Sequence, residues 1–338
     1  MPRYDTDVLI VGGGPGGLAT ALHARAKGLS VIIAEPRESP IDKACGEGLM
    51  PGGLAELRGL GVDPVGMPLR GIAYQDGRRR AEAAFRQGAG RGVRRTSLHA
   101  ALAASAEAVR AEWLSARVTG ISQDADGVTA AGVRARYLVG ADGLHSAVRR
   151  SAGIGAVVGR PRRVGLRRHY TVPAWTEFVE VHWSPMGEAY VTPVEPELVG
   201  VAILSRHRPD LSWFPWLQRR LADAPHGSER GCGPLRQIVS HQVAGRVLLV
   251  GDAAGYEDAL TGEGMSLAIK QAGAAIRAIA ANRPADYERE WRRITRRYRW
   301  LTRALVLGTT PGGGRRAVVP ASAALPGVFR AAVNTLAR

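Results

Sequence analysis

The 338-residue sequence contains only two cysteines, Cys45 and Cys232, and no continuous apolar run long enough to cross a membrane. Two cysteines provide neither a disulfide framework nor the ligand pattern of a zinc site, so we predict no metal site and a reducing, cytoplasmic location. The missing apolar run argues against a membrane-spanning helix, which needs about 20 such residues. A first apolar run begins at Val8, so we also expect no signal peptide.

Lysine is rare as well. Three of the 46 basic residues are lysines, and the net charge is +16. A basic surface favours acidic partners such as nucleic acid, an anionic membrane or a carrier protein. The alternative explanation is coding bias in a GC-rich genome, because Arg, Ala, Gly and Pro are all abundant. The sequence shows no nucleic-acid-binding module, so we expect no nucleic-acid partner.

One glycine-rich loop stands out near the start of the chain. An apolar run over residues 8–11 leads into Gly12, Gly14 and Gly17 and then into a helical pattern. In a dinucleotide-binding βαβ unit, the first glycine allows a tight turn and the second lets the backbone approach a pyrophosphate. The third glycine lets the helix pack against the sheet. The helix start adds unpaired N–H groups and a positive dipole end.

An acid follows this unit at the expected distance. Glu35 ends the apolar run over residues 31–34, where a carboxylate can accept both ribose hydroxyls. A second glycine-rich stretch, at residues 88–92, has no strand before it. We therefore predict one dinucleotide-binding domain and no second domain of this kind.

Two further segments indicate that the dinucleotide is FAD. Over residues 137–150 a strand leads into the turn Asp142-Gly143, and a short helix follows. Over residues 246–273 a strand ends at Asp252, and a helix starts at Gly264. Asp252 lies where a carboxylate can bind the ribityl chain. The helix start would direct N–H groups at the carbonyl edge of the flavin.

These segments together resemble the p-hydroxybenzoate hydroxylase superfamily of FAD enzymes, over roughly residues 5–285. The resemblance implies an α/β fold with a Rossmann-type FAD-binding domain, an inserted antiparallel β-sheet substrate domain and a C-terminal helical segment. The expected divisions are residues 1–68, 93–160 and 240–284 for FAD, 69–92 and 161–239 for substrate, and 285–338 for the helical segment.

The resemblance also implies which residues bind FAD. The family places an arginine before the helix that begins near Thr96, a place that Arg95 fits and for which Arg94 is a rival. The loop 42–49 is expected to pass close to the flavin, where Cys45 either takes part in chemistry or lets the backbone approach the ring. The predicted FAD-binding residues are Gly12, Gly14, Pro15, Gly16, Gly17, Glu35, Pro36, Arg37, Ala44, Cys45, Gly46, Arg95, Asp142, Gly251, Asp252, Gly262, Gly264 and Met265.

The substrate side carries no comparable motif. His169 and Tyr190 are candidates for a base or hydrogen-bond partner of a substrate hydroxyl, with an ordinary role in the sheet as the alternative. Residues 285–307 predict an amphipathic helix with a basic face, which either docks on the FAD domain or contacts a membrane or carrier protein. We expect residues 312–314 to form a hinge or loop, and the apolar last 25 residues to cover the active site.

The leading hypothesis is an FAD-dependent monooxygenase that uses NAD(P)H and O2 to hydroxylate an apolar aromatic, phenolic or polyketide-type metabolite. One alternative is a flavoprotein similar to geranylgeranyl reductases, which saturates isoprenoid double bonds. A second alternative is a flavin-binding protein without catalytic activity. The Trp-x-Trp-x-Ile signature of flavin halogenases is missing, which argues against halogenation.

Overall fold

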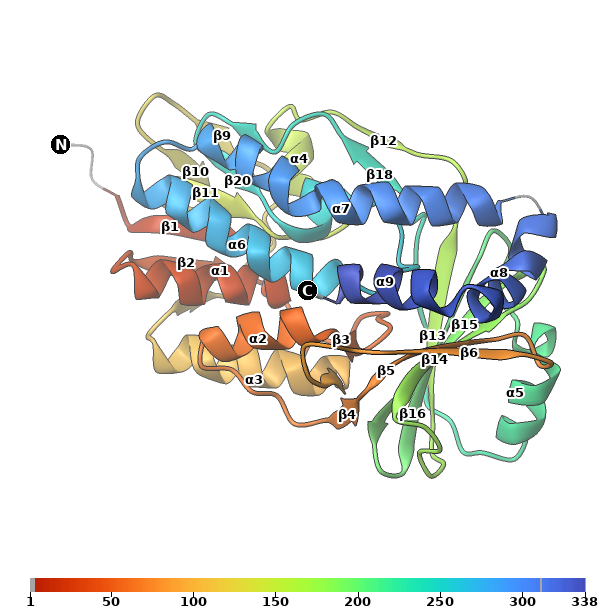
Figure 1. Cartoon of the computed structure of the whole chain (residues 1–338). Helices are drawn as coiled ribbons and strands as arrows, with labels where there is room; N and C mark the ends of the chain where they lie inside the picture. Colours follow the sequence, from red (N-terminus) through yellow and green to blue (C-terminus); the bar gives the residue numbers. More distant parts are fainter. Residues whose placement is uncertain (1–3, 311, 338) are drawn as a thin grey trace.

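The computed structural model describes residues 4–310 and 312–337. Parallel strands form the centre of its larger sheet, which the antiparallel strands β19, β10 and β9 extend (Figure 1). The order of the parallel strands is β20 (Val247–Leu249), β11 (Val133–Gly140), β1 (Thr6–Val11), β2 (Val31–Ala34) and β8 (Glu112–Leu114). The extending strands are β19 (Val243–Ala244), β10 (Val128–Ala130) and β9 (Ser122–Gln123).

The first βαβ unit forms where the glycine pattern predicts it. Strand β1 is almost entirely buried and apolar, and it leads through Gly12, whose φ is +107°, into α1 (Pro15–Ala26). A β-carbon at Gly17 would lie 1.9 Å from the carbonyl oxygen of Gly12. A larger residue at either position would therefore push the helix away from the sheet.

Helices pack around the parallel sheet in a continuous layer. Helix α1 packs against both α3 (Arg95–Ala108) and α6 (Gly264–Ala280), and α6 also contacts α2 (Pro51–Gly59) and α7 (Asp286–Thr309) (Figure 1). The short helix α4 (Ala147–Ser151) follows β11. The largest apolar core of the described chain lies between these helices and the sheet.

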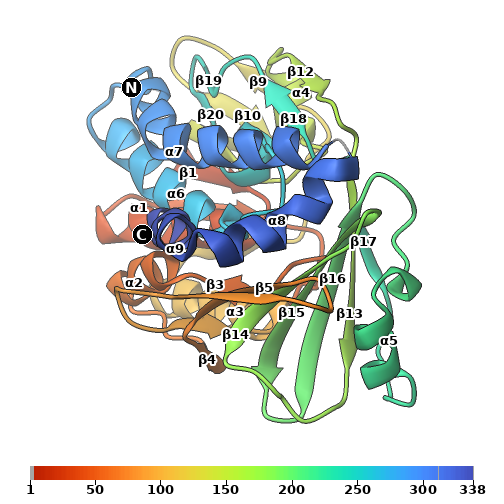
Figure 2. The ribbon, with the colours of Figure 1, turned by 45° about the vertical axis from the view of Figure 1, so that its right-hand side comes forward.

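A second sheet stands beside the first, as Figure 2 shows. Its strands run in the order β17 (Arg230–Cys232), β13 (Val164–Tyr170), β16 (Leu198–Ser205), β15 (Gly187–Glu195), β14 (Phe178–Trp183), β5 (Gly71–Gln75) and β6 (Arg80–Ala84). Helix α5 (Pro215–Leu221) covers one face through Leu217 and Leu221. Two smaller sheets pair β3 (Gly48–Leu49) and β4 (Met67–Leu69) with β7 (Gly90–Gly92), and β12 (Ala156–Val158) with β18 (Gln237–Val239).

The C-terminal segment packs against the second sheet and then runs back toward α2. Helix α8 (Gly312–Ala324) follows α7, and α9 (Pro326–Leu336) runs back to α2, where the amide of Gly52 donates to the carbonyl of Ala337 at 2.9 Å (Figures 1 and 2). The hinge or loop expected at residues 312–314 is a wrong prediction, because these glycines begin α8. A β-carbon at Gly314 would lie 1.9 Å from the carbonyl oxygen of Gly308, so glycine here allows α8 to approach the end of α7.

The predicted fold class is confirmed, since a parallel α/β sheet, a mainly antiparallel second sheet and a helical C-terminus are all present. The predicted domain boundaries stay a prediction. Within the described residues, no single helix is long and apolar enough to span a membrane. The pair Gly313–Ala324 and Pro326–Leu336 meets that criterion jointly, with a bend of 104° between its halves.

Candidate functional site

A cavity of about 1260 Å³ lies at the carboxyl ends of β1, β11 and β20. This edge of an open parallel sheet is where α/β proteins usually bind ligands. Most of the predicted FAD residues line it, namely Gly14, Pro15, Gly16, Arg37, Ala44, Cys45, Gly46, Arg95, Asp142, Gly251, Asp252, Gly262, Gly264 and Met265. Gly12, Gly17, Glu35 and Pro36 do not line it.

Arg95 provides the clearest sign of an anionic ligand. Its side chain is buried, with 7% exposed, and it lines the cavity beside the start of α1. Among the described residues, no hydrogen bond or ion pair to its guanidinium group is found. Burial lowers the pKa of Arg95 and outweighs the opposing effect of Asp252, which makes no direct ion pair with it.

The start of α1 adds backbone N–H donors next to Arg95. Gly14 is its N-cap residue and makes no side-chain cap, so the first-turn amides remain available to a ligand. A β-carbon at Gly14 would meet only the tip of Arg95, at 3.6 Å. A buried cation and free helix amides fit the pyrophosphate of FAD. The rival Arg94 instead lies 3.8 Å from Glu195, away from this position.

Glu35 lies behind the cavity wall. Its carboxylate accepts hydrogen bonds from the Gly13 amide at 2.9 Å and from the Arg37 side chain at 2.8 and 3.0 Å. Burial alone would raise its pKa, but these bonds outweigh burial and lower it. The carboxylate is therefore ionised, and its partner Arg37 lines the cavity, whereas Glu35 itself does not. The predicted contact of Glu35 with a ribose stays a prediction.

Asp252 is held by a lysine that the sequence analysis did not assign to the site. The Nζ of Lys43 lies 2.9 Å from Oδ2 of Asp252, and both residues line the cavity. Burial would raise the pKa of Asp252, but Lys43 lowers it overall, while Asp252 raises the pKa of Lys43. The ion pair joins the loop after β2 to the loop after β20.

Asp142 has two roles in this structure. One carboxylate oxygen accepts the amides of Ala147 at 2.7 Å and Val148 at 3.0 Å, at the start of α4. The other oxygen is buried and has no hydrogen-bond partner among the described residues. Because Asp142 also lines the cavity, this second oxygen is a position at which a ligand donor would be satisfied.

Cys45 lies in the same loop as Lys43 and lines the cavity. Its sulfur is 3.8 Å from the Met265 sulfur and accepts the Glu47 amide at 3.3 Å. Burial raises the pKa of Cys45, so the thiol form dominates. A thiol is a poor nucleophile, which argues for a close-packing role of Cys45 at the cavity wall.

The two other predicted catalytic residues are placed differently. Tyr190 lines the cavity, and its hydroxyl donates to the Leu260 carbonyl at 2.7 Å. His169 is buried outside the cavity lining, with Nε2 at 2.7 Å from the Glu47 carboxylate. Glu47, which lines the cavity, was missed by sequence reasoning. Its only signal was an acid between two glycines in the loop 42–49.

The opposite end of the cavity is apolar. The C-terminal helices provide much of this wall, and Figure 2 shows them beside the second sheet. The expectation that the last residues cover the active site stays a prediction. The apolar side chains that line this end are Ile72, Tyr74, Val179, Val181, Leu260, Leu305, Val318, Leu325, Val328, Phe329, Val333 and Leu336. We call this region the apolar arm.

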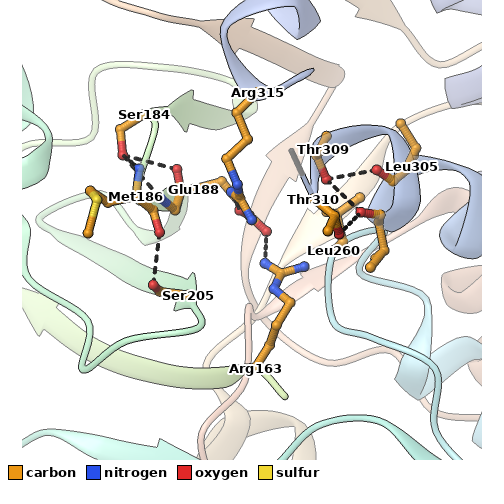
Figure 3. Close-up of polar contacts among 12 residues, drawn as sticks. Arg163, Ser184, Met186, Glu188, Ser205, Leu260, Leu305, Thr309, Thr310 and Arg315 are labelled. Carbon is orange, nitrogen blue, oxygen red and sulfur yellow. Dashed lines mark hydrogen bonds and ion pairs between the residues drawn. The ribbon is translucent and has the colours of Figure 1, made fainter. Parts of the chain in front are cut away.

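A buried ionic cluster joins α8 to the second sheet, and Figure 3 shows three of its members, Arg163, Glu188 and Arg315. Glu188 on β15 is fully buried and pairs with both Arg163 and Arg315 of α8. Arg163 also pairs with Asp258 at 2.9 Å. Burial raises the pKa of Asp258 to about 6, against the opposing effect of Arg163. These four residues, which we call the latch, are far apart in sequence.

Comparison with known proteins identifies the family. A family model described as "FAD binding domain" matches residues 5–183, more than half of the chain. The chain belongs to this family. FAD is therefore its cofactor, and the predicted class, an FAD-dependent oxidoreductase of the hydroxylase superfamily, is confirmed at the level of the family.

Relatives of more than one reaction type are similar to this chain. A 3-(3-hydroxy-phenyl)propionate/3-hydroxycinnamic acid hydroxylase of Mycobacterium avium is 32% identical over 45% of the chain, which spans 31% of that hydroxylase. A rifampicin monooxygenase of Streptomyces venezuelae is 30% identical over 79% of the chain and 62% of that enzyme. A menaquinone reductase of Mycolicibacterium smegmatis is 26% identical over 84% of the chain and 79% of that enzyme.

Solved structures support the fold over nearly the whole chain. A flavin-dependent brominase, Bmp2, in a triple-mutant form, superposes with a TM-score of 0.78 at 19% identity, covering 98% of this chain and 95% of that one. At this identity the similarity establishes the fold alone.

Proposed function

We propose that the chain is an FAD-dependent monooxygenase that hydroxylates an apolar aromatic, phenolic or polyketide-type metabolite. NAD(P)H would supply two electrons, one atom of O2 would enter the product, and the other would leave as water. The observation that carries the proposal is a single cavity with a cationic end that fits FAD and an apolar arm that fits such a substrate. FAD, when bound, supplies the redox chemistry.

Particular residues would hold the cofactor. Arg95 and the amides at the start of α1 would bind the pyrophosphate, and Arg37 with Glu35 would lie near the adenosine ribose. The Lys43–Asp252 pair would meet the ribityl chain. The amides after Gly264, at the start of α6, would face the carbonyl edge of the flavin.

The apolar arm would exclude water and orient the substrate. Tyr190 and Cys45 line the cavity and remain candidates for direct contact with the substrate. His169 lies behind the wall, so it would act through another residue. The described residues contain one βαβ unit with this glycine pattern, so NAD(P)H would bind transiently without a domain of its own.

The test is oxygen labelling. The FAD-loaded protein is given NAD(P)H, ¹⁸O2 and a panel of phenols and aromatic polyketides, and products are analysed by mass spectrometry. We expect NAD(P)H oxidation stimulated by one substrate class and one ¹⁸O atom in the product. A product that forms equally well without oxygen and is two hydrogens heavier would contradict the proposal.

A second candidate is a reductase of isoprenoid or quinone double bonds. The observation that favours it is the similarity to the menaquinone reductase, which extends over 84% of the chain. The rifampicin monooxygenase matches a similar share at higher identity, and for this reason we place hydroxylation first. The anaerobic arm of the same experiment, run with a prenylated quinone, separates the two reactions.

The basic face of α7 is a candidate peripheral contact. Arg289, Arg292 and Arg293 have side chains at least 71% exposed, while Tyr287 and Trp291 on the opposite face are buried. An anionic membrane or an acidic carrier protein would be the partner. Co-sedimentation with vesicles containing phosphatidylserine should fall when these arginines are changed to glutamine, and unchanged sedimentation would refute a membrane contact.

A further inference from the structure

Glu47 lies in the cavity wall and is constrained both by its backbone conformation and by its hydrogen bonds. It is 1% exposed and has a φ of +60°, a backbone conformation that non-glycine residues rarely adopt. One carboxylate oxygen accepts the Arg95 amide at 2.9 Å, and the other lies 2.7 Å from Nε2 of His169. A β-carbon at Gly200 of β16 would lie 2.6 Å from the carboxylate, so a glycine makes room for it. Strained backbone held by surrounding structure often marks a functional site.

The hydrogen bonds around His169 fix which ring nitrogen carries the proton. Nδ1 of His169 lies 3.0 Å from Nη1 of Arg167. A guanidinium group only donates, so Nδ1 must accept, and the proton of the neutral ring must lie on Nε2. Nε2 then donates to Glu47. Arg167 is buried and is held in turn by an ion pair with Asp42.

This chain of contacts connects the second sheet with the first. Arg167 and His169 belong to β13, Glu47 belongs to the loop after β2, and Arg95 begins α3. Glu47 thus connects the backbone of Arg95 to strand β13 of the second sheet. The amide of Val93, just before α3, also donates to the Glu47 carbonyl at 2.8 Å.

We propose that Glu47 is a positioning residue for FAD binding, which links strand β13 to the Arg95 backbone through the neutral imidazole of His169. The inference rests on the proposed placement of the FAD pyrophosphate beside Arg95, and it holds for either candidate reaction. Glu47 sets the position of Arg95 and of the loop 42–49, and His169 provides the donor that keeps the carboxylate in place.

The experiment compares FAD dissociation constants, measured by fluorescence titration of the full-length apoprotein, with thermal unfolding of the same proteins. Glu47→Gln has one acceptor oxygen for two donors, so we expect FAD binding about tenfold weaker. His169→Gln can donate to Glu47 and accept from Arg167, so it should bind FAD within about threefold of the wild type. His169→Leu can do neither, and we expect it to match Glu47→Gln. The exposed Glu56→Gln in α2 is the control.

Nitrogen-15 NMR of the histidine rings gives an independent readout, in which the resonance missing from His169→Gln should be that of an Nε2-protonated neutral ring. FAD affinity of Glu47→Gln within twofold of the wild type, or equal affinity of His169→Leu and His169→Gln, would overturn the proposal. If Glu47→Gln does not fold, the comparison of FAD affinity between His169→Leu and His169→Gln tests the proposal. Arg95→Ala is measured in parallel, because unchanged FAD binding in that variant would refute the placement of FAD itself.

Discussion

The two ends of the cavity are built in opposite ways. The cationic end consists mainly of loops that follow parallel strands, together with the start of α3. There the buried guanidinium group of Arg95 lines the cavity and makes no hydrogen bond or ion pair with the described residues. At the apolar arm the charged groups turn inward and satisfy one another in the latch. The first end therefore depends on a cofactor for its electrostatic balance, and the second is complete without a ligand.

The largest expected effect is at the cationic end. Gly14→Val would place methyl groups where a pyrophosphate must approach the backbone, so we expect no detectable FAD binding. The fold should survive, because a β-carbon at Gly14 meets only the flexible tip of Arg95. Visible absorbance of the purified protein measures this, with Gly59→Ala as a control at a position with open space around it. A yellow Gly14→Val protein would show that the pyrophosphate lies elsewhere.

The latch should be the most sensitive point of the apolar end. Glu188→Gln leaves the buried Arg315 without its carboxylate and weakens the pairing of Arg163, which should cost about 3–5 kcal/mol of unfolding free energy. Arg315→Met should lower the free energy of unfolding by a smaller amount, because Glu188 still pairs with Arg163. Urea unfolding of the apoprotein checks both, and Glu56→Gln serves as the surface control. Equal stability of Glu188→Gln and the wild type would mean that the latch does not hold α8 in place.

Within the cationic end, Asp252 and Glu35 should differ. Asp252→Ala removes a carboxylate that lines the cavity, and loss of a charged hydrogen bond of about 1.5–3 kcal/mol corresponds to ten- to a hundredfold weaker FAD binding. Glu35→Ala should have a smaller effect, because Glu35 does not line the cavity and already pairs with Gly13 and Arg37. Fluorescence titration with FAD measures both. The reverse order would indicate that Arg37 swings away and lets Glu35 bind the ribose.

A further expected effect concerns pH. Burial raises the pKa of Glu263, the N-cap residue of α6, from its ordinary value of 4.5 to about 8. Between these values the folded state binds more protons than the unfolded state, so this residue lowers stability as the pH rises from about 4.5 to 8. Glu263→Gln should therefore gain stability relative to the wild type over that window, by about 1.4 kcal/mol for each pH unit crossed. A difference that does not change between pH 5 and pH 9 would contradict the burial of an ionisable Glu263.

The same contrast explains how much of the site could be predicted from the sequence. Gly12, Gly14, Asp142 and Asp252 are recognisable because each follows a strand of one parallel sheet, and the carboxyl ends of such strands meet. The cationic end therefore follows from local patterns. Lys43 could not be assigned to the site from the sequence, because its partner Asp252 lies on a loop distant in sequence.

The apolar end could not be predicted in the same way. An apolar C-terminal pattern indicates helices, but the position of α8 depends on Arg315 meeting Glu188, and sequence spacing does not encode that pairing. Glycines normally favour a loop, yet residues 312–314 are helical because α8 must approach the end of α7 closely. The role of Glu47 could not be predicted from the sequence, because it depends on His169, which belongs to the second sheet.

The central claim is that FAD and an apolar substrate share one cavity, with the substrate in the apolar arm. The most direct measurement is the change in flavin absorbance when the FAD-loaded protein is titrated with 2-naphthol, an apolar phenol. We predict a saturable spectral shift in the wild type and in Ala323→Trp, which lies on α8 outside the cavity lining. Ala321→Trp, which places a large side chain at a position of α8 that lines the cavity, should lose that shift while retaining FAD. An undiminished shift in Ala321→Trp would contradict the account.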